Sequence, residues 1–202
     1  MRIQADKDER TGSCRDEGRS LPLRKLLTIG LAVIAFAAIH EGLHALAASA
    51  YGEYQAFHVR PFGLEVLFNT PVADRQGVQW AVISGVPNVA TVVLGYLLVA
   101  LRRGLATLGR RIVRELAYWF ALLLILLDPL NLSVGPFLYG GDAQGIAVGF
   151  GVRVGVVQAL SLVLLMVNRE LAAQVVLPAF GVAATHPLLR PLLRLRIRSR
   201  SA

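Results

Sequence analysis

Long apolar runs separated by short polar segments dominate the pattern of this chain. A helix needs about 20 apolar residues to cross the hydrocarbon core of a bilayer, and the stretches 26–50, 77–101, 116 onward and 146–167 provide such runs. A fifth stretch, 171–184, is short and is interrupted by Pro178 and Gly181, which is typical of a half-span or an interfacial segment. The pattern predicts an all-α polytopic membrane protein with about four to five transmembrane helices.

The segment between the first two apolar runs has a different period. Phe62, Leu64, Val66 and Phe68 alternate with other residues, and the Pro and Gly at 61–63 can form a turn. Alternation with a period of two is typical of a β-strand. We therefore expect a short β-hairpin between the first two transmembrane helices.

Composition and charge fit a protein held in a membrane. The chain is 55% hydrophobic with a net charge of +8, and its basic residues gather at the N-terminus, at 102–114 and at the C-terminus. Such clusters are typical of orientation signals and of contacts with lipid headgroups. No basic soluble domain is present that would favour nucleic acid. We predict a multi-pass protein of the cell membrane, with a polar, disordered tail at 1–25, a membrane domain at 26–185 and a basic tail at 186–202.

Ionisable side chains inside the first apolar run are the most informative feature of the sequence. The segment "AIHEGLHAL" places His40 and His44 four positions apart, and four residues of a helix turn by about 400°, so both imidazoles share one face. HExxH on a helix is the pattern of a zinc hydrolase, with two ligands and Glu41 as general base. A charged side chain at the bilayer centre costs about 2.5–3.5 kcal/mol on insertion scales, and a bound metal would compensate for that cost. Buried polar packing without a metal is the alternative.

A catalytic zinc site needs a third protein ligand. His58 and His186 lie in polar flanks, whereas Asp128 and Asp142 lie in or just after the third apolar run. Asp128 precedes a proline, so a helix stop or kink explains it equally well. Asp142 lies in "YGGDAQG", where glycines allow a close backbone approach. We favour Asp142 over Asp128.

Three motifs together resemble the site-2 protease family of intramembrane zinc metalloproteases. They are HEGLH in the first run, "SGVPN" in the second, and "N…GPFLYGGDAQG" after the third, and they cover roughly residues 26–145. The resemblance implies that Asp142 is the third ligand, since Asn131 and Pro136 precede it as in the family's Asn-x-x-Pro…Asp-Gly motif. This chain departs from the motif in having Ala143 after the aspartate and a longer Asn-to-Pro spacing.

The resemblance also assigns supporting roles. Asn88 would support the active site or contact substrate, with hydrogen bonding between helices as the alternative, and Asn131 would be a second supporting residue. The hairpin resembles the family's membrane-associated β-loop, which is thought to present substrate as an added strand. The implied substrate is a transmembrane or membrane-associated protein.

The order of the motifs predicts that they converge. HExxH lies late in the first run, "SGVPN" early in the second and Asp142 at the exit of the third, so alternating spans place all three near one membrane face. The loop 102–114 holds five arginines and no acid, which predicts that this loop is cytoplasmic and that the site faces the other side. The family usually places its active site nearer the cytosol.

The sequence therefore predicts an intramembrane zinc endopeptidase, in which His40, His44 and Asp142 hold Zn²⁺ and Glu41 activates a water. A catalytically silent, metal-binding membrane scaffold of the same family is the alternative. A transporter is disfavoured by the few spans and the lack of an internal repeat. Arg153, inside the fourth run, would pair with Asp128 or Asp142 or reach the membrane surface.

Overall fold

The computed structural model describes residues 5–60, 63–138 and 141–192, with side chains from residue 23 onward. Within this part of the chain, four helical segments are long and apolar enough to cross a membrane. Their bounds are Leu23–Ala50, Gln79–Ala100, Arg111–Phe137 and Val154–Ala179. The prediction of an all-α polytopic protein is confirmed.

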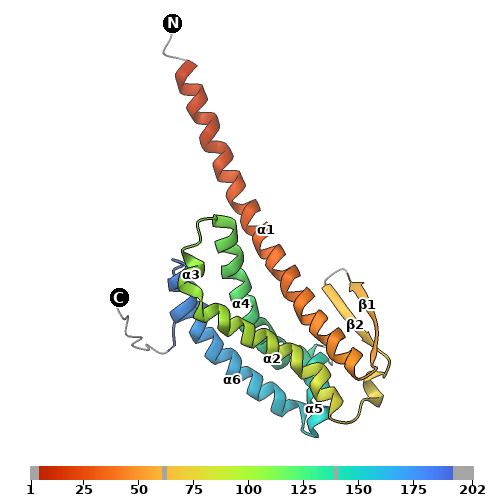
Figure 1. Ribbon diagram of the computed structural model, residues 1–202. Helices are drawn as coiled ribbons and strands as arrows, with labels where there is room; N and C mark the ends of the chain where they lie inside the picture. The colour runs from red at the N-terminus through yellow and green to blue at the C-terminus, as the bar shows by residue number, and fades with distance from the viewer. Residues whose placement is uncertain (1–4, 61–62, 139–140, 193–202) are drawn as a thin grey trace.

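Helix α1 (Ala5–Ala50) forms one side of a bundle that also contains α2 (Gln79–Ala100), α4 (Arg111–Val134) and α6 (Val154–Leu171). Helix α1 packs against α2 and α4, and α4 packs against α6 on its other side (Figure 1). The remaining helical elements are short. They are η1 (Val72–Asp74), α3 (Arg102–Ala106), η2 (Gly135–Phe137), α5 (Gly141–Phe150), η3 (Ala172–Val176), α7 (Leu177–Ala179) and η4 (Pro187–Leu189).

The hairpin predicted between the first two spans is present. Strand β1 (Tyr54–Arg60) pairs antiparallel with β2 (Gly63–Phe68), and the expected turn at 61–62 lies outside the described residues. Val66 on β2 is buried, while Leu64 and Phe68 on the same face are half-buried. Phe62 also lies outside the described residues. Strand β2, rather than β1, makes most of the hairpin's contacts with α1.

The fourth apolar run differs from the expectation of one span at 146–167. The structure divides it into the short helix α5 and the long helix α6, separated by Gly151 at φ +64°. This left-handed conformation favours glycine and ends a helix. Arg153 is the N-cap residue of α6, so it lies outside the span and not inside it as predicted. Among the residues that the structure describes, the ion-pair partners of Asp128 and Asp142 are His40 and His44, and Arg153 pairs with neither aspartate.

The short stretch 171–184 is not a separate crossing. Helix α6 continues through the π-helical turn η3 into α7, and together they form the span Val154–Ala179. Because this run of helix is uninterrupted, the apolar residues of 171–179 complete the fourth span. The bundle therefore has four candidate spans within the described chain, at the lower end of the predicted range.

The two polar ends of the sequence also differ in part from expectation. Helix α1 begins at Ala5, so the backbone of 1–25 is helical over most of its length where a disordered tail is predicted. Extending an existing helix is easy, because each added residue gains a hydrogen bond without a new nucleus. In the basic tail 186–202, the backbone oxygen of Leu188 accepts from Arg169 Nε at 2.8 Å, and residues 193–202 lie outside the described part.

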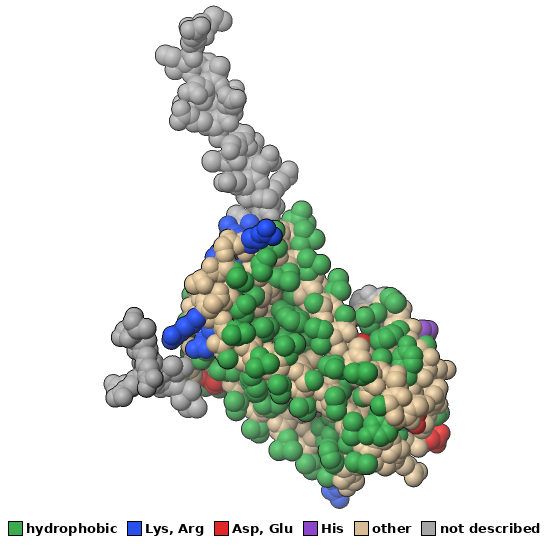
Figure 2. Space-filling model, in the orientation of Figure 1, with side chains coloured by type: hydrophobic (Ala, Val, Ile, Leu, Met, Phe, Trp, Pro, Cys, Tyr) green, Lys and Arg blue, Asp and Glu red, His purple; other side chains and the backbone are tan. Residues whose placement is uncertain are grey.

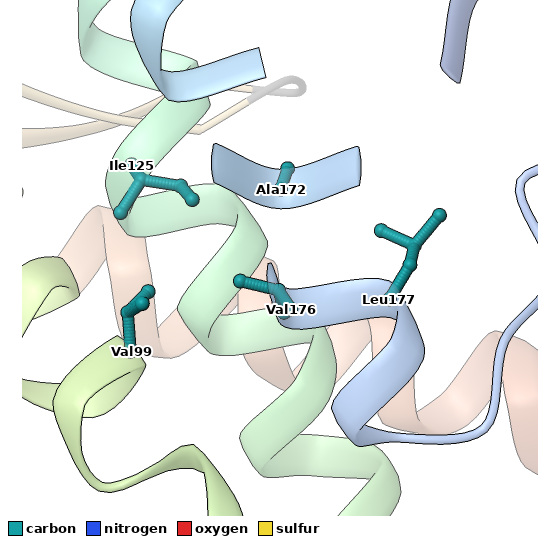
Figure 3. Close-up of a cluster of buried hydrophobic side chains, with 5 residues drawn as sticks. All are labelled: Val99, Ile125, Ala172, Val176 and Leu177. Carbon is teal, nitrogen blue, oxygen red and sulfur yellow. The ribbon is translucent and has the colours of Figure 1, made fainter. Parts of the chain in front are cut away.

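Charged and apolar side chains are separated along the bundle. Figure 2 shows hydrophobic side chains over its middle, with most of the visible Lys and Arg side chains near the grey N-terminal atoms and along the adjoining edge. Between α2, α4 and the segment formed by η3 and α7, five apolar side chains form a buried cluster (Figure 3). It consists of Val99, Ile125, Ala172, Val176 and Leu177.

Candidate metal centre

Two histidines of α1 meet at the end of the bundle next to the hairpin. His40 and His44 lie one turn apart, with 6% and 4% of their surface exposed, and their Nε2 atoms are 3.1 Å apart. Helical spacing alone aligns them, because residues i and i+4 share a face. Phe36 stacks on His40 and Phe68 of β2 packs edge-on against His44, so both rings are held by aromatic contacts.

Asp142 of α5 reaches the same point. Its Oδ1 lies 3.2 Å from His44 Nε2 and its Oδ2 lies 3.4 Å from His40 Nε2. The ligand atoms of His40, His44 and Asp142 all lie within 4.8 Å of one another, and this is the group in the described chain that could hold a metal ion. The predicted convergence of the first and third motifs is therefore present in the structure.

Small residues allow α5 to pack close to α2, and this packing places Asp142 near the two histidines. A Cβ added to Gly145 would collide with the Ser84 side chain, and one added to Gly149 would lie 2.7 Å from Ala81 Cα. Glycine thus permits α5 to pack directly on the backbone of α2, as in other membrane helix pairs. Gly141, at φ +56°, forms the turn just before Asp142. The predicted close approach in "YGGDAQG" thus helps to place Asp142 beside the two histidines.

The outer nitrogens of the two imidazoles also have partners. His44 Nδ1 lies 2.9 Å from the backbone oxygen of Ile83, and His40 Nδ1 lies 3.2 Å from Asp128 Oδ1, although off-line for a good hydrogen bond. A metal-ligating histidine usually donates its other N–H to a carbonyl or a carboxylate, which leaves the inner nitrogen unprotonated. This arrangement directs both Nε2 lone pairs toward Asp142, so the donor set fits a divalent metal.

Asp128 has a role that its sequence context does not reveal. Pro129 does not stop the helix, because α4 continues through that proline to Val134. Asp128 is 2% exposed, accepts a short hydrogen bond from Thr91 Oγ1 and faces the outer nitrogen of His40. It therefore lies behind a candidate ligand, outside the group of three. The sequence signal that could have indicated this was the cost of an unpaired carboxylate in an apolar helix.

Asn88 links α2 to the candidate ligands. Its Nδ2 donates to Asp142 Oδ2 at 3.0 Å and to the Ser84 backbone oxygen at 2.8 Å. The alternative of hydrogen bonding between helices is observed, since this bond joins α2 to α5, while support of an active site stays a prediction. Both amide hydrogens are used, and the Oδ2 atom that Asn88 binds also lies 3.4 Å from His40 Nε2, while Oδ1 lies 3.2 Å from His44 Nε2.

Glu41 lies beside the histidines at a cavity. The cavity measures about 510 Å³ and is lined by residues of α1, β2 and α4, among them His40, Glu41, Leu64 and Asn131. Glu41 is half-buried and accepts a 3.1 Å hydrogen bond from the backbone N–H of Val66 on β2. Asn131 thus lines the same cavity as the predicted base.

Charge around the site favours an ionised Asp142. Burial alone raises the pKa of this carboxyl, but hydrogen bonds with His40 and His44 outweigh burial and hold the pKa below its usual range. Arg75, which sequence reasoning missed, stacks on Trp80 at 4.2 Å and on Phe68 at 4.9 Å. Burial lowers the pKa of Arg75, and the charges of Asp142 and Glu53 oppose that shift. Arg75 lies between the hairpin and the second span and belongs to no sequence motif, so the sequence does not indicate that it lies near the candidate site.

The remaining histidines do not join the site. His58 is exposed on β1, and His186 caps η4 by accepting from Leu188 N–H.

Scans of protein-family models, curated proteins and solved structures find no match to this chain. The geometry of the described residues is therefore the basis for inferring function.

Proposed function

We propose that this protein is an intramembrane zinc metalloendopeptidase that cleaves a transmembrane or membrane-associated protein. The observation that carries the proposal is the convergence of His40, His44 and Asp142 within 4.8 Å, beside a cavity that Glu41 lines. All four side chains belong to motifs that resemble those of the site-2 protease family. This combination supplies three ligands and a base at the end of a transmembrane helix.

Zinc is the metal that this donor set suits best. Two imidazole nitrogens and one carboxylate, with an open fourth position, are typical of catalytic zinc sites in hydrolases. A zinc ion bound there would polarise a peptide carbonyl and lower the pKa of water toward ~7. The outer hydrogen bond of His44 to Ile83 supports the proposal because it sets the tautomer that ligation requires.

The chain's own residues supply the remaining steps. Glu41 accepts the proton of the attacking water and donates it to the leaving amine, since a carboxylate in the cavity can serve first as base and then as acid. Asn88 holds Asp142 in the orientation for ligation through the 3.0 Å hydrogen bond. Asn131 lines the same cavity and would contact the substrate backbone.

The cavity indicates how a substrate would approach. It lies between α1, α4 and β2, and its walls are mostly apolar side chains such as Val33, Leu64 and Leu138. An extended segment unwound from a transmembrane helix fits such a space. The family resemblance implies that the hairpin pairs with this segment, which would present its backbone to Glu41.

A metal-binding scaffold is the second candidate, and one observation favours it. The Glu41 carboxylate accepts a hydrogen bond from Val66 N–H, so Glu41 holds the hairpin against α1 even without chemistry. A scaffold of this kind would need Glu41 for structure. Its function would survive a change that keeps the hydrogen-bond acceptor and removes the basicity.

The substitution Glu41→Gln separates the two candidates. Glutamine keeps an oxygen acceptor for Val66 but cannot take a proton, and loss of a general base typically slows a reaction by about 10²–10⁴-fold. We expect zinc to remain bound while cleavage of co-expressed single-span proteins falls to background. Asp74→Asn, on the exposed element η1, is the control and should cleave as wild type. Wild-type cleavage by Glu41→Gln would contradict the proposed role of Glu41.

A further inference from the structure

A second cavity lies at the opposite end of the bundle from the metal centre. It measures about 360 Å³ and lies between α1, α4 and the segment after α7. Its walls combine three cations, one acid and three aromatic rings. They are Lys25, Arg111, Arg114, Glu115, Tyr118, Trp119, Phe180 and Val182.

The cavity carries an excess of positive charge. Glu115 is its one acid, and it already binds Arg24 from α1 at 3.0 Å and Arg111 at 3.2 Å. No ion pair joins Lys25 or Arg114 to a carboxylate among the residues that the structure describes. Four cations, Arg24 included, against one carboxylate leave a net charge of +3. Within the described chain, an anion would therefore find two cations of the cavity that have no carboxylate partner.

The cavity lies at the depth in the membrane where lipid headgroups are expected, because it is formed by the ends of the spans. Lys25 lies near the start of the first span, Arg111 begins the third, and Phe180 directly follows the fourth. Three spans thus end at the cavity, so it opens at the level of the membrane surface. Tyr118 packs against Trp119 and Phe180 with ring centroids 4.9 Å and 5.4 Å away, and such rings favour the interface between headgroups and acyl chains.

Exposed apolar side chains directly follow two of the cavity's cations, Lys25 on α1 and Arg111 on α4. On α1, Leu26 and Leu27 are 66% and 58% exposed, and Ile112 on α4 is 54% exposed. A ligand with a charged head and an apolar tail would satisfy the cations and this surface together. Free phosphate would use only the cations.

We propose that this cavity binds the phosphodiester headgroup of an anionic glycerophospholipid from the adjacent leaflet. Lys25 and Arg114 donate to the phosphate oxygens, and the aromatic rings contact the glycerol region. Basic pockets between transmembrane helices bind anionic lipids in this way. The site is distinct from the metal centre, and it does not depend on the proposed protease activity.

The test compares two double variants of the full-length protein with equal loss of charge. Lys25→Gln with Arg114→Gln removes the unpaired cations of the cavity. Arg103→Gln with Arg190→Gln removes two exposed cations outside the cavity. Native mass spectrometry in neutral detergent measures retention of phosphatidylglycerol and of phosphatidylcholine, with glycerol phosphate as a soluble competitor.

We expect the wild type to retain one phosphatidylglycerol in preference to phosphatidylcholine. The affinity for phosphatidylglycerol should fall about 10–30-fold in the cavity variant, because each removed cation loses roughly one contact with the lipid. In the control it should fall less than about 2-fold. Arg114→Gln alone should lose about 5-fold, and it tests the site if the double variant does not fold. Equal losses in both double variants, equal retention of the two lipids, or displacement by glycerol phosphate at lipid-like concentrations would each overturn the proposal.

Discussion

Two buried regions of the same bundle are built on different principles. The apolar cluster around Ile125 consists of five side chains that carry no hydrogen-bonding group (Figure 3). The metal centre buries His40, His44, Asn88, Thr91 and Asp128, each of them less than 10% exposed. Both regions use residues of α2 and α4, so the same helices change from apolar to polar packing along their length.

The difference teaches what specifies each region. In lipid, apolar side chains gain little by leaving their surroundings, so the apolar cluster is held by shape and van der Waals contact. Polar groups at membrane depth must find partners. In the candidate metal centre, Thr91 binds Asp128, whose carboxylate faces His40, and the Ile83 carbonyl binds the ring of His44. Substitutions in the candidate metal centre should therefore lower metal affinity. Substitutions in the apolar cluster should instead lower folding stability.

The largest effect should come from removing a ligand. His44→Ala and Asp142→Ala each remove one of the three proposed ligands. Removing a residue that only hydrogen-bonds to a ligand typically lowers metal affinity about 10–100-fold, so we expect each of these variants to lose more than that. Metal analysis of purified protein should give one zinc per chain in the wild type and nearly none in either variant. His58→Ala, on exposed β1, is the control. Full zinc in His44→Ala would show that the cluster is not the metal site.

The next largest effect should come from Asp128, which stands behind a ligand. Asp128→Asn keeps the shape and the acceptor for Thr91 but weakens the interaction with His40 Nδ1. We expect zinc affinity to fall about 10–100-fold, which is typical when a residue that orients a metal ligand is lost. Competition with a chelator measures this, and Asp74→Asn on η1, which is exposed, is the control. An unchanged affinity would mean that Asp128 serves folding alone.

Much of this arrangement could be predicted from the sequence, because it follows from local rules. Run length identifies the spans, helical spacing aligns His40 with His44, and period-two alternation indicates the hairpin. The break at Gly151 could not be predicted, since apolar residues on both sides hide it in the hydropathy pattern. The place of Asp128 depends on how α4 is rotated toward α1, and that rotation is set by packing between helices.

Helix packing offers a smaller effect on the metal centre. Gly149→Ala would place a methyl group against the backbone of Ala81, so α5 must move away from α2. Overpacking typically costs about 1–3 kcal/mol, and a shift of Asp142 should lower zinc affinity about tenfold. Gly155→Ala is the matched control, because a Cβ there meets no atom within 4 Å. Equal zinc affinity in both variants would show that α5 tolerates the added methyl without moving Asp142.

The smallest effect on metal should come from the apolar cluster. Ile125→Ala removes a fully buried side chain that packs among Val99, Ala172 and Val176. The cavity and lost van der Waals contacts should cost about 2 kcal/mol, less than in the most sensitive water-soluble cores because lipid reduces the transfer term. Thermal unfolding in detergent should detect this loss, while zinc affinity stays within about twofold of wild type, since no hydrogen bond of the metal centre involves the Ile125 side chain. The exposed substitution Leu130→Ala on the same helix is the control. If Ile125→Ala loses zinc as His44→Ala does, the two regions are coupled, and shape rather than hydrogen bonding also sets the geometry of the ligands.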